Sequence, residues 1–455
     1  MRLTPEEIAA ALGAEVVAEG EPSSPRRATI ASGEAGPGDL FFGLRGANHN
    51  GGKFAPAAIE TGAWGAVLDE ESRQSFSIHE RENLCRAWVF VVEDPLVAMQ
   101  ALARAWRRAL GASVVGVTGS VGKTSVKDIA RALLPGTVHA NRENLNTEIG
   151  LPLTILEAPD DADALVLEMA MRGKGQIAEL AAIAEPEVAV ITNVGPVHVE
   201  LLGSVEAIAA AKAEILDDLP PGGTAVAPVQ AGELEPHLAP IAEQLRFGPG
   251  GDVEATEVKV DGGVTEALVK TPLGARRFHF PFAEAHNLTN ALAAIAAGVA
   301  LGADPAGMAD RAASIGFSRF RGERLQLPGG IVLVNDCYNA NPVSMRAALD
   351  HLASLEAERT VAVLGEMGEL GPDSAGYHRG VGEHARAAGV DFVVGVGLPA
   401  RDYDPDELVA DPGEAAELLA QRLEPGDAVL VKGSRSAGLE AVAEQLVDLV
   451  PAEEG

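Results

Sequence analysis

The sequence contains very little cysteine and no long apolar run. Its two cysteines, Cys85 and Cys337, lie far apart without a CxxC pattern or a histidine-rich neighbour, which argues against a disulfide framework and a zinc site. No segment approaches the roughly 18 consecutive apolar residues that a bilayer span needs. The N-terminus carries acids where a signal peptide would carry bases. We therefore expect a cytoplasmic protein without membrane insertion.

Basic residues are also scarce. The chain has 35 Lys and Arg against 66 Asp and Glu, which gives a formal net charge of -31. A surface of this sign repels a phosphate backbone and an anionic lipid layer, so we expect no nucleic-acid partner. An anionic substrate would need a local basic pocket. The few lysines inside apolar segments, such as Lys123 and Lys212, are therefore candidates for a functional site.

The remaining composition is that of an ordinary globular protein, with 47% hydrophobic and 22% charged residues. A length of 455 residues predicts two to four domains, because one domain usually takes roughly 100 to 200 residues. We expect three, with boundaries at residues 1–94, 95–317 and 318–455. No internal repeat of 20 to 50 residues is found.

Strand and helix patterns alternate along most of the chain. The first unit mixes short apolar runs with Gly and Pro and ends on WVFVVEDP, which predicts a small α/β domain. A helix at 96–110 then leads into the central unit, with strands expected at 113–120, 164–170, 188–195 and 224–229 and helices at 123–134, 176–184 and 204–216. The last unit repeats the alternation, with strands expected at 331–336, 360–367, 391–397 and 427–434 and helices at 344–355 and 414–423.

This alternation predicts α/β domains built on mostly parallel sheets with helices on both faces. Ligands of such sheets gather at the carboxyl ends of the strands. The segment TGSVGKTS follows an apolar strand there and opens a helix, which is the context of a phosphate-binding loop. It departs from the longer form of the motif, because Val117 stands where a first glycine is usual. The expected nucleotide-binding residues are Thr118, Gly119, Ser120, Val121, Gly122, Lys123, Thr124 and Ser125.

Each residue of this loop has a chemical role. The two glycines let backbone amides turn toward an anion, Lys123 can reach the outer phosphates, and the Thr124 hydroxyl can ligate magnesium. Glu168 and His198 stand at the ends of the next two strands and could complete a metal site. Each alone is more often a polar group that solvates a strand end, and it is their coincidence at successive strand ends that favours a metal site. Lys212, within the apolar helix VEAIAAAKAEIL, reads on composition as a snorkelling surface lysine.

Two further polar clusters stand at element boundaries. Asn287 and Asn290 lie three residues apart at a helix start, where they can cap the helix or meet the edge of a base. The run VNDCYNANP leaves a strand for a loop and contains Asp336, Tyr338 and Asn339. Turns rich in Asn and Asp are common, so this run alone decides little.

At these residues the chain resembles the Mur ligase family. TGSVGKTS, NRENLNTEIGLPLTIL, LEMAMRGKGQIAEL, ITNVGPVHVELLGS, AAAKAEIL, HNLTNALAA, NDCYNANPVSM and LGEMGELG occur in the order and at about the spacing of the family, over nearly the whole chain. The resemblance implies three domains: a small N-terminal α/β domain for the UDP end of a substrate, a central parallel-sheet P-loop ATPase domain, and a C-terminal Rossmann-like α/β domain that closes with the incoming amine.

The resemblance also implies roles for individual residues. Lys123, Glu168, His198 and Lys212 would be catalytic, and Thr124, Glu168, His198 and Lys212 would hold Mg²⁺, with Lys212 carbamylated into a carboxylate-like ligand. The nucleotide would further meet Asn287, Asn290, Asp336, Tyr338, Asn339 and one arginine of the linker, Arg321 or Arg324, between which the sequence does not decide. The expected substrate contacts are Ser32, Arg45, Asn144, Asn146, Thr147 and Arg172, although Ser32-Gly33-Glu34 replaces an Asp-Ser-Arg triplet common in the family.

The implied reaction is an ATP-dependent amide ligation. YNANP and the GEMGELG segment followed by His378 favour the member that adds D-alanyl-D-alanine to UDP-muramoyl-tripeptide, and the DNPR motif of the diaminopimelate-adding members is absent. We expect a monomer that acts on these two small molecules. The alternatives are another amide ligase of the superfamily, adding a single amino acid or extending folate with glutamate, and a non-catalytic ATP-binding regulatory module.

Overall fold

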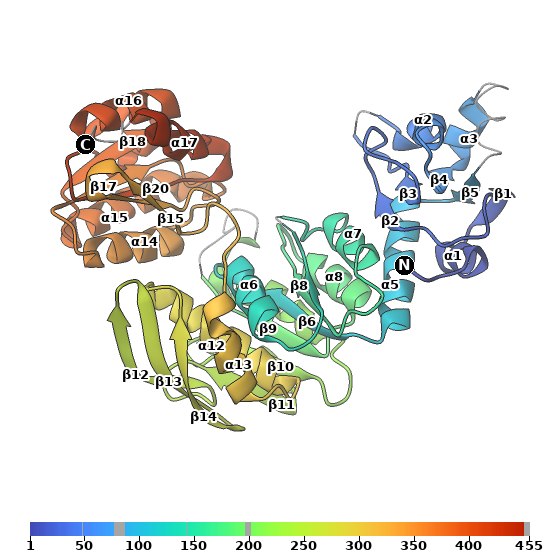
Figure 1. Ribbon diagram of the computed structural model, residues 1–455, viewed down its shortest axis with the longest axis horizontal. Coiled ribbons are helices and arrows are strands. Elements are labelled where there is room, and N and C mark those ends of the chain that lie inside the picture. Colours follow the sequence, from blue (N-terminus) through green and yellow to red (C-terminus); the bar gives the residue numbers. More distant parts are fainter. Residues whose placement is uncertain (48, 77–86, 143, 196–201, 450–455) are drawn as a thin grey trace.

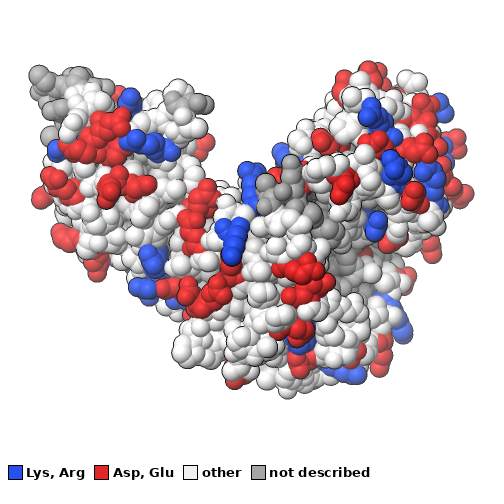
Figure 2. Space-filling model, turned by 180° about the vertical axis from the view of Figure 1, so that it is seen from behind, with Lys and Arg blue, Asp and Glu red and all other residues white. Residues whose placement is uncertain are grey.

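The computed structural model describes residues 1–47, 49–76, 87–142, 144–195 and 202–449 (Figure 1). The chain forms three lobes in sequence order: an N-terminal lobe, a central lobe and a C-terminal lobe. In the described part of the chain, no helix combines the length and the apolar character that crossing a membrane requires. Acidic side chains appear on all three lobes in Figure 2, with basic ones interspersed among them.

The N-terminal lobe is built on a five-stranded sheet with the order β1-β5-β4-β3-β2, in which β1 is antiparallel to β5 and the other neighbours are parallel. Its strands are β1 (Glu15–Ala18), β2 (Arg27–Thr29), β3 (Asp39–Phe42), β4 (Gly65–Asp69) and β5 (Trp88–Val92), and its helices are α1 (Pro5–Leu12), α2 (Ala55–Glu60) and α3 (Glu70–Ser75). Trp64, Trp88 and Phe90 stack against one another with ring centres about 6 Å apart, which closes one face of the sheet.

The central lobe has a six-stranded sheet, parallel throughout, with the order β11-β10-β9-β6-β8-β7. Its strands are β6 (Ser113–Thr118), β7 (Val138–Ala140), β8 (Ala164–Glu168), β9 (Val188–Ile191), β10 (Thr224–Pro228) and β11 (Glu243–Phe247). The helices are α5 (Pro95–Leu110), α6 (Lys123–Leu133), α7 (Gly150–Leu156), α8 (Gln176–Ala184), α10 (Val205–Ala213), α11 (Glu235–Leu238), α12 (Ala285–Ala300) and α13 (Pro305–Arg311).

Alternating residues of these strands fill two separate cores. Val114 of β6 and Leu165 of β8 pack with α5, α7, α8 and α10, whereas Val115 and Val166 pack with α6 and α12 on the opposite face. Helices therefore cover both faces of the sheet, as the alternation in the sequence predicts. Its strand ends meet at one edge, where the phosphate loop opens.

A three-stranded antiparallel sheet was not expected from the sequence. It contains β12 (Glu254–Asp261), β13 (Val264–Thr271) and β14 (Gly274–Phe280) in that order. Phe278 and Phe280 of β14 pack with α12 and α13 in the second core of the central lobe. The side chains of β12 are mostly exposed, so this strand shows no apolar periodicity in the sequence.

The C-terminal lobe carries a second six-stranded sheet with the order β15-β16-β20-β17-β18-β19, in which β15 is antiparallel to β16 and the rest are parallel. The strands are β15 (Glu323–Leu327), β16 (Ile331–Asn335), β17 (Arg359–Leu364), β18 (Phe392–Val396), β19 (Glu407–Val409) and β20 (Asp427–Lys432). The helices are α14 (Pro342–Ser354), α15 (Ser374–Ala387), α16 (Pro412–Arg422) and α17 (Glu440–Leu449).

Candidate active site

The loop between β6 and α6 has the shape that anion binding requires. Gly119 and Gly122 have φ values of 149° and 81°, a region that other residues rarely adopt. A Cβ at Gly119 would overlap the Thr192 hydroxyl at the end of β9. Asn193 fixes the loop from the same side, because its carbonyl accepts from the Ser120 amide at 3.1 Å and its side-chain oxygen accepts from the Val121 amide at 2.9 Å. The loop is thus preorganised by the neighbouring strand end.

Lys123 opens helix α6 and folds back over the loop. Its Nζ donates to the Gly119 carbonyl at 2.8 Å. The pKa of Lys123 is lowered, first because surrounding protein disfavours the charged ammonium and also because Arg321 is nearby, while Glu168 opposes the shift. The Thr118 hydroxyl, buried at the end of β6, finds no hydrogen-bond partner within the described residues. A polar phosphate group at this position would provide partners for both side chains.

Two oxygen groups expected at the metal site lie side by side. The Thr124 hydroxyl donates to Glu168 Oε2 at 2.7 Å, and the Asn146 side-chain amide donates to Glu168 Oε1 at 2.8 Å. Glu168 and Thr124 are both buried. A carboxylate next to a hydroxyl is the kind of hard oxygen set that Mg²⁺ takes, usually together with substrate phosphates and water.

The other two expected metal ligands are placed differently. His198 lies outside the described residues. Lys212 of α10 is only 2% exposed, so it is not the snorkelling surface lysine that composition alone suggests. Its pKa is lowered well below the ordinary lysine value, chiefly because burial penalises the charged form and also because Lys123 repels it. The described ranges hold no group of three or more His, Cys, Asp or Glu arranged for a metal ion.

Asn141 is a residue of this site that sequence reasoning missed. It is 3% exposed, and its side chain accepts from the Glu168 backbone amide at 2.6 Å and donates to the Leu145 carbonyl at 2.5 Å. Lys127 of α6, also buried, donates to the Asn141 carbonyl at 2.9 Å. Asn141 therefore joins the strand end that carries Glu168 to the loop that carries Asn144, Asn146 and Thr147, of which Asn144 and Thr147 are exposed. Nothing in the sequence distinguishes it from an ordinary loop asparagine.

Asn287 and Asn290 reach the phosphate loop from α12. The Asn290 side-chain amide donates to Asn287 Oδ1 at 3.3 Å, and the Asn287 amide donates to Glu284 Oε2 at 3.2 Å. A Cβ at Gly122 would overlap Asn290 Oδ1. Neither asparagine caps α12, whose N-cap residue is Glu284. The capping alternative left open by the sequence is therefore wrong, and Asn290, supported by Asn287, lies beside the phosphate loop.

The C-terminal lobe contributes an arginine and a tyrosine. The Arg321 guanidinium lies 4.0 Å from the centre of the Tyr338 ring, and its Nε atom is buried without a hydrogen-bond partner in the part of the chain that the structure describes. Arg321 is also among the charges that act on Lys123. Arg324, by contrast, is exposed on β15. Of the two arginines, Arg321 is the one that faces the phosphate loop.

A buried lysine holds the loop that follows β16. Lys432 Nζ contacts Asp336 Oδ2 at 2.5 Å and donates to the Asn339 carbonyl at 3.1 Å, and its side chain is 2% exposed. The Asn339 side chain accepts from the Ala340 amide at 2.8 Å. This arrangement fixes Asp336, Tyr338 and Asn339 at the carboxyl edge of the C-terminal sheet.

The remaining substrate-side residues are dispersed. Ser32 and Arg45 belong to the N-terminal lobe, and in Figure 1 that lobe lies apart from α6, at whose start the phosphate loop ends. Arg45 already pairs with Asp69 at 2.8 Å and with Glu71 at 2.7 Å. Arg172 is exposed and lies 3.8 Å from Glu369 of the C-terminal lobe. The structure brings none of these three to Lys123.

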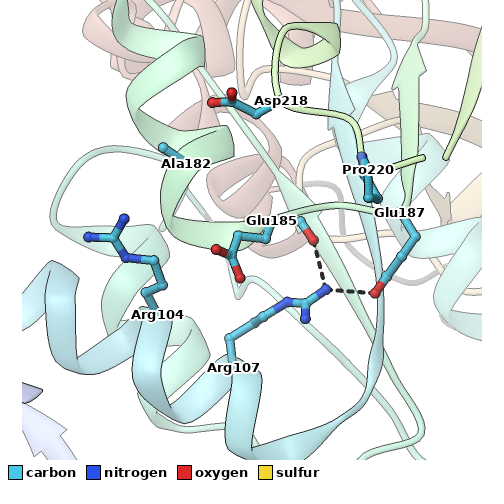
Figure 3. Close-up of a pocket in the computed structure, with 7 residues that line it drawn as sticks. All are labelled: Arg104, Arg107, Ala182, Glu185, Glu187, Asp218 and Pro220. Atoms are coloured by element: carbon cyan, nitrogen blue, oxygen red, sulfur yellow. Dashed lines mark hydrogen bonds and ion pairs between the residues drawn. The ribbon is translucent and has the colours of Figure 1, made fainter.

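A pocket of about 440 Å³ lies at the opposite, amino-terminal edge of the central sheet (Figure 3). Arg107 of α5 reaches across it and donates to the Glu185 carbonyl and to Glu187 Oε1, both at 2.7 Å. These bonds join α5 to the start of β9, and Figure 3 shows them within the pocket wall. The pocket has a structural explanation and takes no part in the site described above.

The comparisons with known proteins agree with this geometry. Residues 117–298 match the Mur ligase middle domain, and residues 320–435 match the Mur ligase glutamate ligase domain. The chain is 39% identical over 426 residues to the UDP-N-acetylmuramoyl-tripeptide--D-alanyl-D-alanine ligase of a Synechocystis strain, covering 90% of this chain and 89% of that one.

Two solved structures extend the likeness to the whole fold. MurF from Acinetobacter baumannii superposes with a TM-score of 0.87 at 28% identity, covering 98% of this chain and 99% of that one. MurF ligase from Thermotoga maritima, solved in complex with ADP, gives a TM-score of 0.82 at 30% identity, covering 93% and 98% of the two chains.

Proposed function

The chain belongs to the Mur ligase family, and from that premise we propose that it joins D-alanyl-D-alanine to UDP-N-acetylmuramoyl-tripeptide at the expense of ATP. The products are UDP-N-acetylmuramoyl-pentapeptide, ADP and phosphate, and the pathway is peptidoglycan biosynthesis. The family resemblance and the three-domain α/β architecture predicted from the sequence are both confirmed. The relatives covered over about nine tenths of this chain carry the dipeptide-adding name, which disfavours the single-amino-acid ligases.

One structural observation carries this function. The phosphate loop, the Thr124–Glu168 pair and the Arg321–Tyr338 pair come from two lobes and converge on the same strand edge. A binding module that only senses ATP would need the phosphate loop alone. A ligase must also place a second molecule against the outer phosphate, so it needs groups from another lobe.

The chemistry required is activation of a carboxylate. A carboxylate oxygen of the tripeptide attacks the outer phosphorus of ATP, the bond to ADP breaks, and an acyl phosphate forms. The neutral amine of D-alanyl-D-alanine then attacks the acyl carbon through a tetrahedral intermediate. That intermediate expels phosphate, which keeps the former carboxylate oxygen, and the amine loses its extra proton to solvent. Lys123 and Arg321 would stabilise the negative charge on the transferring oxygens, which their neighbouring positions support.

Magnesium and a modified lysine belong to this proposal. Thr124 and Glu168 would hold Mg²⁺, which would neutralise phosphate charge as a Lewis acid. Lys212 supports the expected carbamylation, because a buried amine with a lowered pKa is neutral more of the time and so can add CO₂. The carbamate would bring an anionic oxygen pair in place of a buried cation, and His198 would be a further ligand.

The substrate-side assignments are also proposals. The N-terminal lobe, residues 1–94, would bind the UDP end through Ser32 and Arg45, and the central lobe, 95–317, would present Asn144, Asn146, Thr147 and Arg172 to the muramoyl peptide. The C-terminal lobe, 318–455, would bring Asp336, Tyr338 and Asn339 to the nucleotide beside Asn287 and Asn290. We propose that the protein acts in the cytoplasm, since both ATP and a UDP-linked precursor are available there. We also propose that it is a monomer.

An amine panel tests the function. Purified protein with ATP, Mg²⁺ and UDP-muramoyl-tripeptide should release phosphate when D-alanyl-D-alanine is present and should yield a product heavier by the dipeptide less water. Single amino acids should support little turnover. Turnover with a single amino acid, and none with the dipeptide, would keep the ligase class and reject the substrate. Failure of every amine with folded protein would favour the regulatory module.

A further inference from the structure

A row of polar side chains in contact runs from the C-terminal lobe to the phosphate loop. His351 of α14 lies with its Nε2 atom 3.3 Å from Glu284 Oε1. The other oxygen of Glu284 accepts from Asn287, which in turn accepts from Asn290, and Asn290 lies against Gly122. Figure 1 shows α14 on the side of the C-terminal lobe that faces α12. Four side chains therefore connect two lobes at the position where the nucleotide binds.

The first contact of this row is largely buried. The side chains of His351 and Glu284 are 8% and 14% exposed. By comparison, in the Arg172–Glu369 pair, which also joins the two lobes, the side chains are 80% and 47% exposed. Exposed ion pairs contribute little to stability, whereas a largely buried polar contact with a carboxylate is costly to break, because it leaves a polar group without a partner. The His351–Glu284 contact is thus a well-defined polar attachment of the C-terminal lobe.

Local structure does not require either side chain. Glu284 is the N-cap residue of α12, but within the described ranges its side chain makes no capping hydrogen bond. His351 stands in the last turn of α14, whose C-terminal end is capped by the backbone amide of Leu355 donating to the Leu352 carbonyl. The pKa of His351 is lowered, chiefly by burial, while Glu284 and Asp336 raise it and Arg324 lowers it. Burial thus favours the neutral form of the imidazole, whose Nε2 atom faces Glu284.

We propose that His351 and Glu284 are positioning residues of the ligase: their contact docks the C-terminal lobe and, through Asn287 and Asn290, aligns the phosphate loop with Arg321 and Tyr338. This proposal rests on the ligase function given above. Neither residue touches the reacting atoms. The pair acts by fixing the lobe that supplies Arg321, so its loss slows the reaction without removing any group that contacts ATP.

The experiment combines kinetics with a direct measure of closure. His351→Ala, Glu284→Ala and the double variant are compared with wild type for kcat, for the KM of ATP, and for the radius of gyration in solution with and without ADP. His384→Ala is the control, because His384 of α15 also pairs with a carboxylate, Asp350 of α14 at 2.7 Å, but this pair lies inside the C-terminal lobe and is more exposed, at 30% and 61%. His351→Gln, which can keep a donor near Glu284, tests rescue.

Each single variant should lose about tenfold or more in kcat, and the double variant should be no slower than the slower single one, because both remove the same contact. The contraction of the wild type on binding ADP should be reduced in all three. His351→Gln should recover part of the rate, and His384→Ala should match wild type. Equal rates in His351→Ala and His384→Ala, or losses that multiply in the double variant, would overturn the proposal.

Two safeguards keep the result interpretable. If His351→Ala does not fold, Glu284→Ala removes the same contact from the side of the central lobe. Its kcat and radius of gyration then test the proposal. If the wild type forms no product with any amine, the ligase function fails, but the ADP-dependent contraction and its loss in the variants can still be measured. Contraction that is unchanged in Glu284→Ala would reject the positioning role whatever the substrate is.

Discussion

Asn290 of α12 lies so close to Gly122 of the phosphate loop that the loop has no room for a side chain there. Gly122 also has a φ of 81°, which L-residues adopt only with strain. Gly122→Ala should therefore push Asn290 away, distort the loop and weaken ATP binding by about tenfold or more. Titration calorimetry with ATP measures this directly.

Gly111→Ala is the matched control for that variant. Gly111 ends α5 with a φ of 66° but has no heavy atom near the place of a Cβ. Gly111→Ala should lower the free energy of unfolding by about 1 kcal/mol and leave the affinity for ATP unchanged. If both variants bind ATP equally well, close approach of Asn290 is not what the loop requires.

The Thr124–Glu168 pair predicts a graded response to substitution. Thr124→Ser keeps the hydroxyl and should stay active, whereas Thr124→Val and Glu168→Gln should lower kcat by about 100-fold and raise the Mg²⁺ concentration needed for half-maximal rate. Initial rates over a magnesium series separate the two effects. Full activity of Thr124→Val would show that the Thr124 hydroxyl is not a metal ligand.

Carbamylation of Lys212 can be tested without an activity assay. Wild-type protein equilibrated with ¹³C-bicarbonate should show a carbamate carbon signal, because the lowered pKa of the buried amine favours its neutral form. The signal should be absent from Lys212→Met and present in Lys174→Met, since Lys174 is exposed. A spectrum of the wild type that matches Lys212→Met would show that the lysine is unmodified.

The stability of the N-terminal lobe should depend on Asp69. Burial acts to raise the pKa of Asp69, but hydrogen bonds from Arg45, Ser72 and Asn50 outweigh it and lower the pKa to about 2. The unfolded value is about 3.9, so the stabilisation is present above about pH 4 and is lost as the pH falls toward 2. Asp69→Asn should lower the free energy of unfolding by ~2 kcal/mol at neutral pH. The difference between variant and wild type should shrink as the pH falls from about 4 toward 2.

Tryptophan fluorescence during urea unfolding follows that lobe in a Trp106→Phe background, because Trp64 and Trp88 belong to it and the third tryptophan, Trp106, lies in α5. Glu71→Gln is the control: Glu71 also pairs with Arg45 but is 63% exposed, so its loss should change stability little. An effect of Asp69→Asn that persists unchanged at pH 2 would contradict this account.

Lys432 should be essential for the order of the C-terminal site loop. Lys432→Met removes the partner of Asp336 and the donor to the Asn339 carbonyl, which should destabilise the C-terminal lobe by ~2 kcal/mol. Lys259→Met, at an exposed position of β12, should have little effect. Thermal melting followed by circular dichroism compares the two. Equal melting of both variants would show that the Asp336 contact contributes nothing.

Much of the fold was accessible from the sequence because its signals are local. Each buried parallel strand reads as a short apolar run, and the phosphate loop needs a strand, two glycines and a helix start within one segment. The expected strands at 113–120, 164–170 and 188–195 are confirmed as β6, β8 and β9. The antiparallel sheet was missed because β12 is largely exposed and its pattern gives no apolar period.

The contacts that complete the site were not accessible, because they join residues far apart in sequence. Asn141 bonds to Glu168, 27 residues away, and His351 meets Glu284 across two lobes. The choice between Arg321 and Arg324 depended on which side chain the linker turns toward Tyr338. A single sequence records the chemical type of such residues but not their meeting in space.

The most direct test of the account follows an oxygen atom. UDP-muramoyl-tripeptide labelled with ¹⁸O in its terminal carboxylate is incubated with ATP, Mg²⁺ and D-alanyl-D-alanine, and the released phosphate is analysed by mass spectrometry. Ligation through an acyl phosphate predicts one ¹⁸O in each phosphate, together with formation of the pentapeptide product. Phosphate without the label would mean that ATP is hydrolysed by water and that the carboxylate is never phosphorylated, which contradicts the account.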